Sequence, residues 1–127
     1  MRFNTFEEYC AHHGIAESDV LPDVSRVPKK HQAAILSTTK LVLLTEAINE
    51  GHDFNWNDWQ ERKWRPWFDL EVDENNPTGF RFGGSVCDCV HTSAGGGSRL
   101  CYRSESDSDF SGTAWEKYWR DLMVIPK

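Results

Sequence analysis

Between residues 68 and 102, the apolar side chains fall almost entirely on even-numbered positions. Side chains alternate between the two faces of a β-strand, so residues of one parity share one face of a sheet. Two segments rich in Asn, Pro, Gly and Ser, residues 73–79 and 92–98, divide this region into three strands. The pattern predicts a three-stranded antiparallel meander whose inner face carries Phe68, Leu70, Val72, Phe80, Phe82, Val86, Val90, Leu100 and Tyr102.

The charged residues of the first hairpin support one register. Pairing Val72 with Phe80 places Glu71 opposite Arg81, which is a favourable cross-strand charge pair. The second hairpin pairs Val90 with Leu100 in the same way. The outer face then carries Trp67, Asp69, Glu71, Arg81, Cys87, Cys89, His91, Arg99, Cys101 and Arg103.

An alternative register remains open at Gly83 and Gly84. Two successive glycines in a strand suggest a bulge, and a one-residue shift exchanges the two faces of everything that follows. The cysteines would then turn inward. Leu100 and Tyr102 favour the unshifted register, in which Cys89 and Cys101 lie on the outer face.

Helices are predicted before and after the three strands in the sequence. Thr5 and Glu8 form a T-x-x-E capping box, and a long helix covers residues 29–50 and ends at Gly51. A serine-rich acidic loop, residues 104–112, precedes a last helix that a second capping box, Thr113 with Glu116, opens. We expect one α+β domain over residues 1–127: two N-terminal helices, the three-stranded meander, and a C-terminal helix packed on one sheet face.

Composition narrows the function classes. The formal net charge of −6 disfavours a general nucleic-acid binder, which must neutralise phosphates. The N-terminus lacks the apolar core of a signal peptide, and no stretch is apolar enough for a membrane span, so we expect a cytoplasmic protein with no membrane partner. In that compartment cysteines are usually thiols or metal ligands.

Four residues of the predicted sheet have the ligand types of a zinc site. They are Cys87, Cys89, His91 and Cys101. Tetrahedral zinc sites use loops that curl around the metal, whereas residues two apart on a flat strand lie about 6.5 Å apart. Half-buried thiols beside a surface histidine are therefore the favoured interpretation, and zinc binding is a minor alternative.

Aromatic and basic residues alternate between residues 54 and 68. Trp56, Arg62, Lys63, Trp64 and Arg65 have the mixture of rings and cations that single-stranded nucleic-acid sites use. Acidic residues dilute the charge of this segment, and tryptophans also anchor long connections onto a core. Nucleic-acid binding is therefore kept as an alternative.

Four segments resemble a group of short uncharacterised proteins encoded in phages and prophage regions of gut anaerobic bacteria. The segments read LPDVSRVPKKHQAAIL, KLVLLTEAINEG, DFNWNDWQERKWRPWF and GSRLCYRS. None contains a catalytic signature. The resemblance implies a small accessory protein made in the host cytoplasm, without a known activity.

These observations favour a non-enzymatic module that binds another protein and needs no cofactor. Exposed tryptophan and arginine are the usual anchors of protein interfaces. The candidate binding residues lie in the Trp-rich segment and on the outer sheet face: Trp56, Trp59, Arg62, Lys63, Trp64, Arg65, Trp67, Arg81, Arg99 and Arg103. The sequence does not define the oligomeric state.

Overall fold

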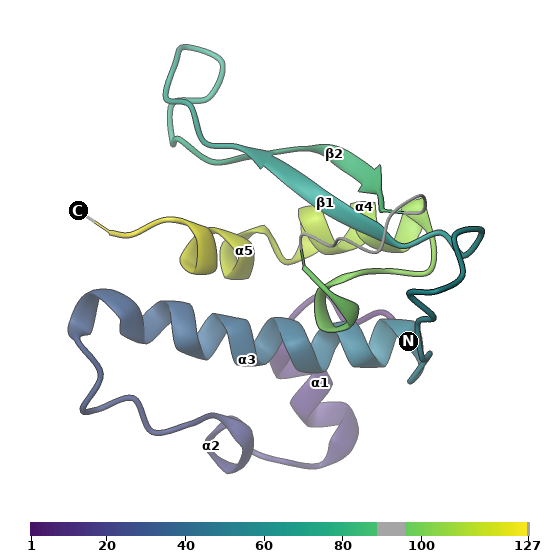
Figure 1. Ribbon diagram of the computed structural model, residues 1–127. Helices are drawn as coiled ribbons and strands as arrows, with labels where there is room; N and C mark the ends of the chain where they lie inside the picture. The colour runs from purple at the N-terminus through teal and green to yellow at the C-terminus, as the bar shows by residue number, and fades with distance from the viewer. Residues whose placement is uncertain (89–95, 127) are drawn as a thin grey trace.

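The computed structural model describes residues 1–88 and 96–126 and shows an α+β fold. Its elements are α1 (Phe6–His13), α2 (Glu17–Val20), α3 (Lys29–Asn49), β1 (Trp64–Asp69), β2 (Arg81–Cys87), the 3₁₀ turn η1 (Ser98–Leu100), α4 (Glu105–Ala114) and α5 (Glu116–Met123). The β1–β2 hairpin covers one side of α4 and α5, and α3 lies on the opposite side of α5 (Figure 1).

The first and third helices begin and end close to where the sequence predicts. The Glu8 amide donates to Thr5 Oγ1 (3.2 Å), while the Glu8 carboxylate accepts from the Asn4 amide (2.8 Å). Helix α3 ends at Asn49. The two residues that follow both have a left-handed backbone conformation, with φ 53° at Glu50 and φ 72° at Gly51. The predicted start and end positions are confirmed because capping signals are local in the sequence. The capping box is only half formed, since Glu8 accepts from the Asn4 amide and not from the Thr5 amide.

The predicted three-stranded meander is wrong in its third strand. The described residues form a two-stranded antiparallel sheet, and Ser98–Leu100 is a 3₁₀ turn. Tyr102 makes one isolated bridge, with Trp64 of β1 instead of with β2. Cys89, Val90 and His91, which would pair with this segment, lie outside the described residues.

The first hairpin is shifted by two residues from its predicted register. Phe68 pairs with Phe82 and Asp69 with Arg81, so the ion pair forms with Asp69 in place of Glu71. A shift of two preserves the faces, and Phe68 stacks on the buried Phe80 at 4.6 Å between ring centroids as the parity requires.

The parity prediction fails at the ends of the sheet. Leu70 and Val72 follow β1 in the turn and are 46% and 70% exposed, so neither belongs to an inner face. Cys101, placed on the outer face, is buried. The alternation stops at these positions because they lie outside the regular strands.

The predicted acidic loop at residues 104–112 is instead most of helix α4. Ser104 caps it by accepting from the Asp107 amide at 3.1 Å. The buried residues of α4 are Ser108, Ser111 and Gly112, so the inner face of this helix is small and polar. At Gly112 an added Cβ would lie 2.3 Å from the Phe82 ring, which shows how closely α4 approaches the hairpin.

The second predicted capping box does not form. Thr113 lies inside α4, where its hydroxyl donates to the Asp109 carbonyl at 2.8 Å, and Trp115 precedes the first residue of α5. The aromatic residues predicted for the last helix are nevertheless at its core face: Trp115, Tyr118 and Trp119 are buried. The prediction of a C-terminal helix is confirmed, but the predicted start at Thr113 is wrong because α5 begins at Glu116.

A buried hydroxyl network joins three elements beneath the hairpin. Tyr102 Oη is 2.9 Å from Thr45 Oγ1 of α3 and 2.7 Å from Ser111 Oγ of α4. The Trp119 indole N–H also donates to Ser111, at 3.0 Å. Burial raises the pKa of Tyr102 far above its usual value, so the hydroxyl stays protonated and holds these elements together.

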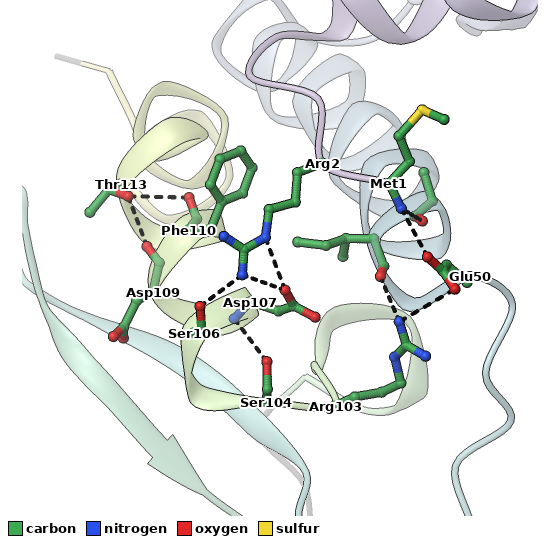
Figure 2. Close-up of polar contacts among 12 residues, drawn as sticks. Met1, Arg2, Glu50, Arg103, Ser104, Ser106, Asp107, Asp109, Phe110 and Thr113 are labelled. Atoms are coloured by element: carbon green, nitrogen blue, oxygen red, sulfur yellow. Dashed lines mark hydrogen bonds and ion pairs between the residues drawn. The ribbon is translucent and has the colours of Figure 1, made fainter.

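The first two residues tie α3 to α4. Figure 2 shows the Arg2 guanidinium donating to Asp107 Oδ1 (2.8 Å) and Ser106 Oγ (2.7 Å). The Met1 amine donates to the Ala47 carbonyl in the last turn of α3 (2.9 Å). Glu50 accepts ion pairs from Met1 (3.6 Å) and Arg103 (4.0 Å), so two cations lie at the negative end of the helix dipole.

Candidate interaction surface

Trp67 lies flat on the side of the hairpin that faces away from the helices. A Cβ added to Gly83 would lie 2.1 Å from the Trp67 ring, so only a glycine allows the indole to rest on β2. Gly84 has φ 144° and also contacts the ring. The side chain remains 44% exposed. The indole ring is therefore held in position against β2, and its other face is accessible to a binding partner.

Two ion pairs flank this ring. The Arg65 guanidinium lies 3.1 Å from Asp88 Oδ2, and the Arg81 guanidinium lies 3.0 Å from Asp69 Oδ2. We call Arg65, Trp67, Asp69, Arg81, Val86 and Asp88 the hairpin face. It carries two cations and two carboxylates, and is therefore close to neutral.

A bulge beside Trp67 determines which residues belong to this face. The register shifts between Trp67 and Phe68, as the alternative based on the glycine pair allows. After the bulge, the Ser85 hydroxyl points toward α4 and bonds with Ser108 and Asp109, both at 2.7 Å. Val86, predicted on the inner face, consequently lies opposite Arg65 on the hairpin face.

Lys63, predicted as a nucleic-acid contact, is a buried structural cation. Its side chain is 2% exposed, and its ammonium donates to the carbonyls of Asp58 (3.2 Å) and Glu61 (3.0 Å). The Glu61 carboxylate lies 3.2 Å away, and the Trp56 ring centroid 5.2 Å away. These contacts fold the connection between α3 and β1 around one charge, so Lys63 is not available to a phosphate.

Glu61 is the counterpart of Lys63 in this connection. Burial alone would raise its pKa, but the Asn55 amide, Lys63 and His52 donate to the carboxylate and outweigh that effect. The pKa of Glu61 is therefore below its usual value. The ionised form stabilises the connection.

The remaining predicted residues are scattered. Trp59 is 64% exposed and Arg62 is exposed, whereas Trp56 and Trp64 are half-buried. Arg99 is exposed beside η1, and Arg103 is exposed but donates to the Ile48 carbonyl at 3.1 Å. Thus Arg65, Trp67 and Arg81 are the predicted binding residues that the hairpin brings together. Asp69, Val86 and Asp88 complete that face and had not been selected as binding residues.

The predicted metal ligands are only partly described. Cys89 and His91 lie outside the described residues, Cys87 is half-buried at the end of β2, and Cys101 is buried. The described part of the chain contains no group of three His, Cys, Asp or Glu side chains able to hold a metal ion. Burial raises the pKa of the Cys101 thiol to about 12, which disfavours the thiolate that zinc requires.

We expect Cys101 to resist alkylation in the folded protein. A pKa of about 12 lowers its thiolate fraction at pH 8 on the order of a thousandfold relative to an unperturbed thiol. Brief iodoacetamide treatment followed by peptide mass spectrometry should therefore label Cys101 only after urea denaturation. Rapid labelling of Cys101 without denaturant would contradict its burial.

Comparisons with family models, with curated proteins and with solved structures give no match to this chain. Among the helices of the described residues, none combines the length and the apolar character needed to cross a membrane.

Proposed function

We propose that this protein is a non-enzymatic interaction module that binds another protein through the hairpin face, with Trp67 as the anchor. The observation that carries the proposal is the half-exposed Trp67 ring held against Gly83 and Gly84. Tryptophan and arginine dominate the binding energy of protein interfaces. A ring that is already fixed also loses little conformational freedom on binding.

The charges of the hairpin face support a protein partner over a nucleic acid. Arg65 and Arg81 are each paired with a carboxylate, and Lys63 is buried. A single-stranded nucleic acid would need cations that release counterions from phosphates. A near-neutral surface centred on an aromatic ring suits the polar and aromatic surface of a protein.

The distribution of polar groups supports a binding role over catalysis. The hydroxyls of Thr45, Tyr102 and Ser111 form a network whose three residues are at most 1% exposed. Such a network stabilises the fold and cannot meet a substrate. From the resemblance of its sequence, we further propose that the module is an accessory protein of phage or prophage origin.

Affinity capture with three forms of the protein tests the hairpin face. Wild type, Trp67→Ala and Trp59→Ala would be used as bait in lysate of the organism that encodes the chain. Trp59 is a matched control because it is 64% exposed and lies before β1. We expect a captured protein that Trp59→Ala retains and Trp67→Ala loses, with at least about 30-fold weaker binding when the purified pair is titrated.

The variant is expected to remain folded. Truncating a half-exposed ring lowers the free energy of unfolding by about 1 kcal/mol, which thermal denaturation by circular dichroism would verify. If every captured protein binds wild type and folded Trp67→Ala equally, the hairpin face is not the binding surface and the proposal fails.

A further inference from the structure

The turn between β1 and β2 exposes two aliphatic side chains among carboxylates. We call residues 70–79 the hairpin tip. Leu70 is 46% exposed and Val72 is 70% exposed, and they alternate with Glu71, Asp73 and Glu74, all exposed. Exposed aliphatic side chains that lie close together mark a candidate interaction site.

The hairpin tip is held in one conformation by hydrogen bonds. The side chain of Asn76, which is 2% exposed, donates to the carbonyls of Asp69 (2.9 Å) and Glu71 (2.8 Å). The Asp73 carboxylate accepts from the Asn76 amide (2.9 Å), and the Gly79 amide donates to the Asn76 carbonyl (3.1 Å). The tip is therefore preorganised to insert its aliphatic residues elsewhere.

A groove on α3 has complementary properties. It is open to solvent, has a volume of about 510 Å³ and is lined by Val27, His31, Ala34, Ile35, Thr38, Thr39 and Leu122. The hydroxyls of Thr38 and Thr39 donate to the carbonyls of Ala34 (2.6 Å) and Ile35 (3.0 Å), so these threonines present their methyl groups. The lining is almost entirely apolar apart from the His31 ring.

The rim of this groove carries positive charge. Lys30 and Arg120 line an adjoining hollow that shares Ala34 with the groove, and Arg26 directly precedes Val27 of the groove lining. All three are exposed, and none has an ion pair among the residues that the structure describes. Asp121 also lines the hollow, and it accepts a hydrogen bond from Ser37 at 2.8 Å.

We propose that the hairpin tip of one copy of this chain occupies the α3 groove of a second copy. Leu70 and Val72 enter the apolar groove, and the carboxylates of Glu71, Asp73 and Glu74 meet the basic rim. Charge complementarity favours this occupant: the cations beside the groove have no ion-pair partner among the described residues, and the tip carries carboxylates. Cations gathered at one place are notable in a chain whose net charge is −6. The hairpin turn and the start of α3 lie toward the same end of the molecule (Figure 1), and we take the exchange to be reciprocal, which gives a two-fold dimer.

Sedimentation velocity of the full chain over a range of concentrations tests this inference. We expect a monomer–dimer equilibrium that weakens as salt rises, since the rim charges are exposed to solvent. A tip variant, Leu70→Ser with Val72→Ser, and a groove variant, Ile35→Glu, should each be monomeric. Trp59→Ser is the matched control for removing an exposed apolar side chain, and it should dimerise as wild type does.

Mixing the two variants gives the sharpest test. The tip variant retains an intact groove and the groove variant an intact tip, so an equimolar mixture regains one of the two contacts. We expect a weak heterodimer in the mixture although each variant alone is monomeric. Circular dichroism establishes that both remain folded.

Charge reversal separates the proposed contact from other modes of association. Lys30→Glu with Arg120→Glu should abolish the dimer, and adding Glu71→Lys with Glu74→Lys in the same chain should restore it. A wild type that is monomeric throughout, a dimer unaffected by the tip and groove variants, or a failure of charge restoration would each overturn the inference. Trp67→Ala should leave the dimer intact, which keeps this test independent of the hairpin-face partner.

Discussion

Replacing Lys63 with alanine is expected to lower the free energy of unfolding by about 3 kcal/mol. Removing one partner of a buried ion pair leaves the other charge without compensation, at a cost of roughly 3–5 kcal/mol. The Glu61 side chain is 22% exposed, so water relieves part of that cost and the lower end of the range applies. Urea denaturation followed by tryptophan fluorescence would measure the loss.

The neighbouring Arg62 supplies the control. It is exposed, and its replacement with alanine should change the free energy of unfolding by less than about 0.5 kcal/mol. If the two variants lose the same stability, Lys63 does not hold the connection in place. This pair also tests the nucleic-acid alternative, because Lys63 contributes to such binding only if it is accessible.

Acid conditions provide a second measure of the same contact. The pKa of Glu61 lies below its usual 4.5 in the folded protein. The ionised carboxylate therefore contributes fully to the free energy of unfolding above about pH 4.5, and this contribution is lost as the pH falls through the folded pKa. Removing Lys63 moves that pKa back toward 4.5. The stability difference between pH 7 and pH 3 should therefore be smaller in Lys63→Ala than in wild type.

Truncating Tyr102 to alanine is expected to cost about 4 kcal/mol of stability. The residue is fully buried, and removing a large aromatic side chain from a core costs roughly 3–5 kcal/mol through lost burial and the cavity that remains. Tyr102→Phe isolates the hydroxyl. We expect that variant to lose about 1–2 kcal/mol, since Thr45 and Ser111 each lose a hydrogen-bond partner in a dry environment.

Tyr9→Phe is the control for the hydroxyl. Tyr9 is half-buried, and its hydroxyl makes no hydrogen bond within the described residues. Removing this hydroxyl should therefore lower the free energy of unfolding by less than about 0.5 kcal/mol. Chemical denaturation of the four proteins gives the comparison. Equal stabilities for Tyr102→Phe and wild type would show that the network does not stabilise the fold.

Features that depend on local signals could be predicted from the sequence. The cap at Thr5, the end of α3 and the aromatic face around Trp115 each follow from a few neighbouring residues. The even-numbered aromatic residues likewise identified the inner side of the hairpin, and a register error of two residues did not change that side. The α+β class follows from these elements.

Helix α4 could not be recognised by hydrophobic periodicity. Its buried positions are Ser108, Ser111 and Gly112, which resemble a loop in composition. They become favourable only when Ser85, Tyr102 and Trp119 arrive from other elements to satisfy the hydroxyls. The one local signal for this helix is the cap, Ser104 with Asp107 three residues later.

The candidate surface was predicted in part for a similar reason. Parity assigns Trp67 and Arg81 to it, whereas the pairing of Arg65 with Asp88 depends on the bulge at Gly83. Lys63 was misassigned because a lysine beside arginine and tryptophan suggests an exposed cation. Only the tertiary structure shows that the carbonyls of Asp58 and Glu61 enclose it.

The contacts of the first six residues have a consequence for how the chain folds. Trp115 donates to the Phe3 carbonyl at 2.7 Å, and the Phe6 amide donates to Tyr118 Oη at 3.0 Å. Each contact closes a loop of about a hundred residues. Forming such a contact is slow because the chain loses conformational entropy before the contact provides any stabilisation. During synthesis, α1 and α3 must therefore wait for α4 and α5 to leave the ribosome before the core can close.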